Sequence, residues 1–198
     1  MLKLFWYTII LMAIISCKSR NTVFSKKKLS DQITDMAHRD QQSQKDLIDA
    51  IKSQRDKKII DSLENEKKII FESNCKKSID ILNTYGYPNY DLVSEDASND
   101  YWLIVQHCDN NIKFQKKALK QLEKFAKIGK ANITNMAYLR DRVNKSSKKP
   151  QIYGTQVFRN KNGKYEVYPI QNSESVDDRR KNVGLEPVQE YLDSMNNQ

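Results

Sequence analysis

The sequence predicts a mainly α-helical fold, a bundle of about six or seven helices with one small β-hairpin near the C-terminal end. Apolar residues recur at helical spacing through most of the chain. Asn162-Gly163 lies between two runs rich in Tyr, Val and Phe, which is typical of a hairpin turn. The chain has 198 residues, of which 38% are apolar, enough for one domain with a modest core.

The N-terminus has the pattern of a lipoprotein signal. A short positive start is followed by the apolar run 4–15, which is too short to span a bilayer comfortably, and then by Ile14-Ile15-Ser16-Cys17. These four residues resemble a bacterial lipobox, in which the cysteine is acylated and becomes the mature N-terminus. We therefore expect a signal peptide over 1–16, lipidation at Cys17, a basic tether over 17–28 and one domain over 29–198. The alternatives are an uncleaved anchor and an ordinary signal with a chance cysteine.

The first half of the domain is expected to be helical. Residues 29–52 form a first helix, in which Asp40 and Gln44 fall on the apolar stripe. They either face inward and find polar partners, since burying them unpaired costs a few kcal/mol, or mark a solvated gap. Further helices are expected over 55–71 and 74–84, and Gly86 stands where a helix-ending glycine belongs.

The second half continues the helical pattern and then changes. We expect helices over 97–108, 112–128 and 132–143, and strands over 156–159 and 164–168 on either side of Asn160–Gly163. Ser175 is expected to cap a helix that begins at Val176 and stops at Gly184. A last helix begins near Pro187.

Two cysteines lie inside the domain. The envelope would allow Cys75 and Cys108 to form a disulfide. Nothing in the sequence places them within bridging distance, so we expect two separate buried thiols, with the disulfide as the alternative.

Several polar side chains fall on inward faces or in the uncharged, glycine-containing segment 151–156. Histidine suits proton transfer near neutral pH, amides give paired donor and acceptor groups, and arginines hold carboxylates or phosphates. Adjacent Asp141 and Arg142 point different ways, so each needs a partner elsewhere. We expect one pocket containing His107 and Asp141 as catalytic candidates, and, as ligand-binding candidates, Gln115, Arg142, Gln151, Tyr153, Thr155, Gln156 and Arg180. With no cysteine or histidine cluster, we expect no metal and no cofactor.

The motifs resemble a bacterial family of proteins with a domain of unknown function. Its pattern is matched by Gln106-His107-Cys108-Asp109, Phe114-Gln115, Ala137-Tyr138-Leu139, Asp141-Arg142, Gln151-Ile152-Tyr153-Gly154-Thr155-Gln156, Asp177, Arg179-Arg180 and Gly184-Leu185. Asp40-Gln41 is a weaker match, and Gly86-Tyr87-Pro88 departs from the Gly-Trp-Pro of the family. The resemblance covers about residues 30–194 and implies membership without implying an activity.

Three functions remain open from the sequence. One is binding of a small polar or anionic ligand or an envelope polymer, another is an enzyme with His107 as general acid or base, and the third is a structural lipoprotein with a buried polar network. The formal charge of +9, in lysine-rich runs along the chain, is interpreted as a solvated surface rather than a nucleic-acid interface, because no nucleic-acid motif accompanies it. We expect a lipid-anchored protein at the periplasmic face of the outer membrane.

Overall fold

The computed structural model describes the backbone of residues 2–197 and the side chains of residues 26–197. In this part of the chain there are seven α-helices, one short 3-10 helix and a two-stranded hairpin, which confirms the predicted mainly helical fold. The elements are α1 (Leu2–Lys52), α2 (Lys57–Tyr85), α3 (Glu95–Gln106), α4 (Ile112–Ala126), α5 (Ile133–Ser146), β1 (Val157–Arg159), β2 (Tyr165–Val167), η1 (Ser173–Ser175), α6 (Val176–Lys181) and α7 (Val188–Asn196).

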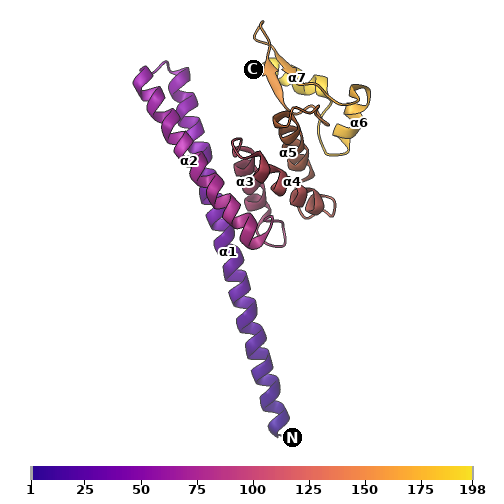
Figure 1. Cartoon of the computed structure of the whole chain (residues 1–198). Helices are drawn as coiled ribbons and strands as arrows, with labels where there is room; N and C mark the ends of the chain where they lie inside the picture. Colours follow the sequence, from indigo (N-terminus) through magenta and orange to yellow (C-terminus); the bar gives the residue numbers. More distant parts are fainter. Residues whose placement is uncertain (1, 198) are drawn as a thin grey trace.

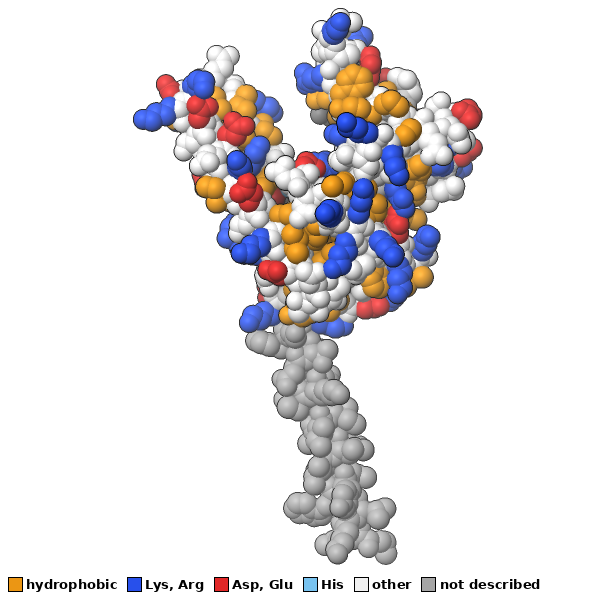
Figure 2. Space-filling view, in the orientation of Figure 1, with side chains coloured by type: hydrophobic (Ala, Val, Ile, Leu, Met, Phe, Trp, Pro, Cys, Tyr) orange, Lys and Arg blue, Asp and Glu red, His pale blue; other side chains and the backbone are white. Residues whose placement is uncertain are grey.

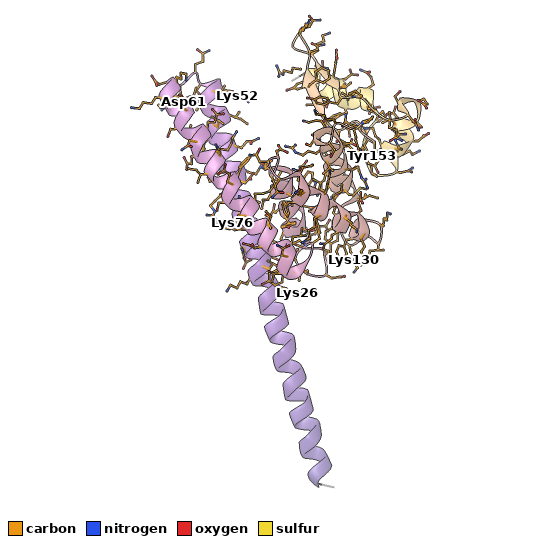
Figure 3. The ribbon with its side chains drawn as sticks, in the orientation of Figure 1. Lys26, Lys52, Asp61, Lys76, Lys130 and Tyr153 are labelled. Carbon is orange, nitrogen blue, oxygen red and sulfur yellow. A yellow bond between two sulfur atoms is a disulfide. The ribbon has the colours of Figure 1, made fainter. Side chains whose placement is uncertain are left out.

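The helices form an arm and a body. α1 and α2 pack antiparallel, and their connected ends project from the molecule as a two-helix arm (Figure 1). Lys52 and Asp61 mark the tip of this arm, and Tyr153 lies in the body on the other side of the molecule (Figure 3). α3, α4 and α5 form the centre of the body, and the hairpin, α6 and α7 cover its far end (Figure 1).

One long helix, α2, replaces the two helices predicted over 55–71 and 74–84. No glycine or proline interrupts the chain between Phe71 and Asn74. The buried Asn74 side chain donates a hydrogen bond to the Met36 carbonyl of α1 at 2.9 Å. Asn74, near which a new helix was predicted to begin, therefore lies inside α2 and connects α2 to α1. Asp56 caps the start of α2, and Gly86 ends it with a left-handed φ of 76°.

The other boundaries follow from local caps. α3 begins at Glu95, two residues before the predicted start, because the Ser94 side chain accepts a hydrogen bond from the Ala97 N–H. Asn111 and Asn132 cap α4 and α5 in the same way. α6 begins at Val176, as predicted, and Ser175 occupies its N-cap position, but the expected cap hydrogen bond is not formed. Ser175 ends η1, makes no cap bond, and its hydroxyl instead accepts a hydrogen bond from Arg179.

The hairpin agrees closely with the prediction. β1 and β2 pair antiparallel, with Val157 opposite Val167 and Arg159 opposite Tyr165. Gly163 takes a φ of 76° in the turn, a conformation that favours glycine. Residues Asn160–Gly163 therefore form the turn that Asn-Gly predicted.

A main core joins α1 through α5, and a smaller cluster lies under the C-terminal end. The largest fully buried apolar side chains of the main core are Ile33, Met36, Tyr87, Tyr101, Ile104, Leu122 and Leu139. The smaller cluster contains Ala137, Val183 and Leu185. Cys75 and Cys108 form a disulfide with a Cα–Cα distance of 5.5 Å, so the expectation of two separate thiols is wrong. The two cysteines are 33 residues apart in the sequence, and their contact depends on helix packing, which the local sequence pattern does not reveal.

The predicted signal peptide and Cys17 lie outside the residues whose side chains are described. The helix α1 already includes residues 26–28, the end of the expected tether, and the Lys26 side chain donates to the Asp91 carbonyl. Among the described residues, no helix has the length and hydropathy needed to cross a bilayer.

Candidate functional site

A groove of about 620 Å³ runs between α2 and the turn that connects α3 to α4. Residues of α2 from Glu64 to Ile79 form one wall, and residues 107–111 form the other. The space-filling view shows a notch between the two-helix arm and the body of the molecule (Figure 2). Because α2 is an arm helix and residues 107–111 belong to the body, the groove lies where the arm joins the body.

His107 is the histidine of this groove and is held on two sides. Its Nδ1 lies 2.7 Å from Oδ1 of Asp40, a fully buried residue of α1. Its ring stacks on Phe71 of α2, with a centroid distance of 4.5 Å and an interplanar angle of 4°. The other ring nitrogen, Nε2, has no hydrogen-bond partner among the described residues, and 16% of the side chain is exposed. Asp40 Oδ2 is also buried without a partner.

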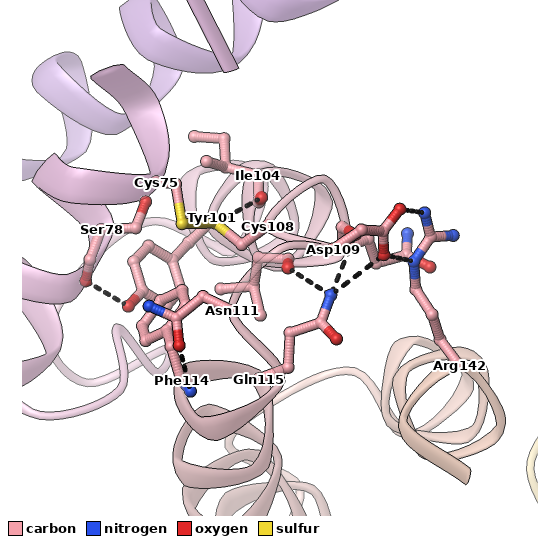
Figure 4. The surroundings of a disulfide bond; sticks show 12 residues. Cys75, Ser78, Tyr101, Ile104, Cys108, Asp109, Asn111, Phe114, Gln115 and Arg142 are labelled. Atoms are coloured by element: carbon pink, nitrogen blue, oxygen red, sulfur yellow. Dashed lines mark hydrogen bonds and ion pairs between the residues drawn. A yellow bond between two sulfur atoms is a disulfide. The ribbon is translucent and has the colours of Figure 1, made fainter. Parts of the chain in front are cut away.

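The disulfide fixes the end of the groove next to His107. It joins Cys75 of α2 to Cys108, the residue after His107, and the Cys108 Sγ contacts the Ile104 carbonyl (Figure 4). The buried Gln115 amide donates to the carbonyls of Val105 and Gln106, which end α3. Gln115 therefore binds the two backbone carbonyls that directly precede His107, and these bonds help to fix the position of the histidine.

Arg142 finds its partner on the same turn. Its Nε and Nη2 donate to the two carboxylate oxygens of Asp109 at 2.7 and 2.6 Å (Figure 4). Burial raises the pKa of Asp109, but the hydrogen bonds and charge of Arg142, with smaller contributions from Gln115 and Lys145, hold it below its usual value. This pair attaches α5 to the turn at the groove.

Asp141, the neighbour of Arg142, is directed away from the groove toward the segment 151–156, which we call the loop. Its two carboxylate oxygens accept hydrogen bonds from the backbone N–H groups of Ile152, Tyr153 and Thr155 and from the Thr155 hydroxyl, at 2.7–3.1 Å. The residue is 0% exposed. A carboxylate that accepts this many donors organises backbone, as in a helix cap.

Gln151 closes the loop on itself. Its Nε2 donates to the carbonyls of Gln156 and Tyr168, and its Oε1 accepts the Gln156 N–H at 2.6 Å. Gly154 takes a φ of 68° and an added Cβ would lie 2.6 Å from the Ile170 side chain, so the loop requires glycine there. The amides of this loop are used to define its shape.

Two arginines of α6 bind the loop carbonyls from the other side. Arg180, fully buried, donates to the Tyr153 carbonyl at 2.8 Å and to the Glu186 carbonyl, and its guanidinium lies 5.1 Å from the Tyr191 ring. Arg179 donates to the Ile152 carbonyl at 2.8 Å. The loop is thus bound by a carboxylate at its N–H groups and by guanidinium groups at its carbonyls.

Residues 27–198 match a family of unknown function, DUF6624. The chain belongs to this family. Searches of curated proteins and of solved structures returned no match. The membership agrees with the expectation of a family of unknown function.

The predicted site residues of this DUF6624 protein divide into two clusters. His107, Gln115 and Arg142 lie at or behind the groove. The other cluster surrounds the loop and contains Asp141, Gln151, Tyr153, Thr155, Gln156 and Arg180. Among the described residues no hydrogen bond or ion pair connects His107 to the loop; the expected single pocket is two separate sets of contacts.

Four contributors were not among the predicted site residues. Asp109, the partner of Arg142, lies in the Gln106-His107-Cys108-Asp109 motif on which the resemblance rested. Asp40 had a signal, because it falls on an apolar stripe of α1 and so either pairs or faces water; the structure shows that it pairs. Arg179 lies in the Arg179-Arg180 motif beside a residue that was named. Phe71 had no signal beyond its place on the apolar face of α2, since its stacking on His107 depends on tertiary packing.

Proposed function

We propose that this DUF6624 protein is lipid-anchored in the cell envelope and acts at the His107 groove as a general acid–base catalyst on a polar ligand. The envelope part is supported by the signal pattern in the first 17 residues and by the disulfide, since disulfides persist in oxidising compartments. The periplasmic face of the outer membrane remains our expectation. The catalytic part is supported by one observation, the geometry of Asp40 and His107.

A buried carboxylate on one ring nitrogen of a histidine selects the tautomer. When Asp40 Oδ1 accepts the Nδ1–H of His107 at 2.7 Å, Nε2 carries the lone pair. That nitrogen is the one without a partner among the described residues, on a ring that lines the groove. Asp40 also stabilises the imidazolium that forms when Nε2 takes a proton. Asp40 is thus the positioning residue, in place of the predicted catalytic Asp141.

The groove lining restricts the chemistry. Cys75 and Cys108 are joined in the disulfide, and the groove residues include no serine, threonine or free thiol to act as a nucleophile. We therefore assign His107 a role as base toward water or a hydroxyl of the ligand, rather than toward a serine, threonine or cysteine nucleophile of the protein. Lys67, Lys68 and Lys76 line the same groove together with the acidic residues Glu64, Glu72 and Asp109. This mixed lining favours a small polar ligand, or a polar part of an envelope polymer, that offers both donors and acceptors.

A second candidate, a structural protein without a ligand, is favoured by the loop. There, Asp141, Gln151 and Arg180 are fully buried, and their bonds run to the backbone of the same domain. Apart from Arg180 Nη2, which is buried without a hydrogen-bond partner, these side chains are used within the network, and such a network fixes a fold without a ligand. This candidate accounts for the loop but leaves Nε2 of His107 without a role.

The test compares His107→Gln with His38→Gln in the full chain. His38 is the only other histidine, lies exposed on α1 and does not line the groove. Turnover is measured on ester, phosphoester and glycosidic substrates. We expect the loss of a general base to lower turnover about 10²–10⁴-fold in His107→Gln and to leave His38→Gln unchanged.

Stability must be separated from activity, because His107→Gln leaves the buried Asp40 carboxylate without its partner. The double variant Asp40→Asn/His107→Gln removes the buried charge as well and should recover most of the unfolding midpoint without recovering turnover. Saturable ligand binding with no turnover in the wild type would replace catalysis by binding in the same groove. If the wild type shows neither turnover nor binding, the structural candidate stands.

A further inference from the structure

The positive charge of the chain is concentrated in one segment. Residues 112–149 contain twelve lysines and arginines and two acidic residues, Glu123 and Asp141. The remainder contains 22 basic and 23 acidic residues, so it is close to neutral, and the +9 of the whole chain comes from α4, α5, their connection and the three residues that follow α5. The lysine-rich runs in the rest of the chain are balanced by acidic residues. A local excess of this size creates a positive field over one face.

The lysines of α4 form one exposed stripe. They fall at helical spacing on the face opposite the buried residues Phe114, Leu119 and Leu122, at positions 113, 116, 117, 120, 124 and 127. Blue side chains gather over the α4 and α5 region in the space-filling view (Figure 2). This face lies on the body, apart from the groove at His107.

A concavity of about 270 Å³ interrupts this face between α4 and the end of α5. Lys116 and Lys120 line it from α4, and Lys149 lines it from the segment after α5. The Ser147 hydroxyl, also in its lining, is buried and has no hydrogen-bond partner among the described residues. Three ammonium groups and a hydroxyl therefore surround one space, with the polar Asn144 beside them.

The charges of the concavity do not cancel. Its one carboxylate, Glu123, forms an ion pair with Arg140, which also lines it. Lys116, Lys120 and Lys149 form no ion pair among the described residues. The C-terminus of α5 contributes about half a negative charge, but the backbone N–H groups of Ser147 and Lys149 cap carbonyls of its last turn. A net positive site remains.

We propose that this concavity, which we call the α4–α5 pocket, binds a phosphate group. Three lysine ammonium groups and a hydroxyl supply several donors around one centre, which suits a tetrahedral anion with three or four acceptor oxygens. The volume holds the phosphate together with part of the molecule that carries it. The phosphate belongs to a lipid headgroup, such as that of phosphatidylglycerol, or is free in solution.

The experiment measures the thermal unfolding midpoint of the full chain in neutral detergent. The probes are inorganic phosphate and dihexanoyl phosphatidylglycerol below its micelle concentration, each against sodium chloride at equal ionic strength. Near saturation, we expect the wild-type midpoint to rise by about 2–4 °C over chloride. The variant Lys116→Ala/Lys120→Ala/Lys149→Ala should lose this rise.

A matched control separates the pocket from the surrounding charge. Lys113→Ala/Lys124→Ala/Lys127→Ala removes the same charge from the same stripe outside the pocket and should keep the rise. A rise with inorganic phosphate alone identifies free phosphate as the ligand, and a rise with the lipid identifies a headgroup. Equal losses in the two triple variants, or no rise with either probe in the wild type, would overturn the proposal. Neither result bears on His107.

Discussion

The loop and the groove use similar polar residues in opposite ways. At the loop, one carboxylate, Asp141, accepts four donors, and Gln151 and Arg180 direct their bonds to backbone of the same domain. At the groove, the Asp40 carboxylate accepts from His107, and Nε2 of the histidine is left without a partner among the described residues. The comparison shows that an inward polar residue is a functional candidate when its unused donor or acceptor belongs to a side chain that lines a groove, as His107 does and Arg180 does not.

The largest expected effect is at the loop. Asp141→Ala leaves three backbone N–H groups and the Thr155 hydroxyl without their acceptor, so we expect a loss of about 3–5 kcal/mol in the free energy of unfolding, measured by urea denaturation. Asp177→Ala is the control, because the Asp177 carboxylate accepts one N–H, that of Val188, at an exposed position. It should cost about 1 kcal/mol. Equal losses in the two variants would mean that the loop is not the internal network described above.

The next effect is at the groove. The disulfide closes 33 residues of chain, and the loop-entropy relation gives about 3–4 kcal/mol of stabilisation. We expect the free energy of unfolding of Cys75→Ser/Cys108→Ser, measured by urea denaturation, to be lower by this amount. Dithiothreitol should lower the urea midpoint of the wild type to that of the double variant. The reductant should leave the double variant unchanged. A wild type that is insensitive to reductant would contradict the contribution of the disulfide to the groove.

The smallest expected effect on stability is at the ion pair of Arg142 with Asp109, which lies between the groove and the loop. The pKa of Asp109 is lowered in the folded state, so its contribution to stability is present above the unfolded pKa of about 4 and is lost as the pH falls through the folded value. Because the carboxylate is more than half exposed, the contribution is below about 1 kcal/mol. Between pH 5 and pH 2, Asp109→Asn should lose less stability in urea than the wild type. Parallel curves would show that the pair contributes nothing measurable.

Much of the fold followed from local patterns, and the site followed only in part. Helical spacing and Asn162-Gly163 predicted the helices and the hairpin, because each signal is contained within a few turns of chain. The opposite directions of Asp141 and Arg142 also followed from helix geometry, and the structure confirms that each has a separate partner.

The pairings between distant elements were not predictable in the same way. The contact between His107 and Asp40 spans 67 residues, and the disulfide joins α2 to the turn after α3. Both depend on how α1 and α2 pack against α3, which the sequence pattern leaves open. The single pocket was expected because all the polar candidates were assumed to serve one purpose, and Asp141 serves another.

The unbroken length of α2 has a mechanical consequence. Its 29 residues form a rod of about 43 Å, with the arm tip at one end and Phe71 and Cys75 near the middle. A continuous helix has no joint at which to absorb a displacement, and the disulfide pins this rod to the body at Cys75. A displacement of the arm tip would therefore be carried along α2 toward Cys75, and Phe71, which stacks on His107, lies on that path.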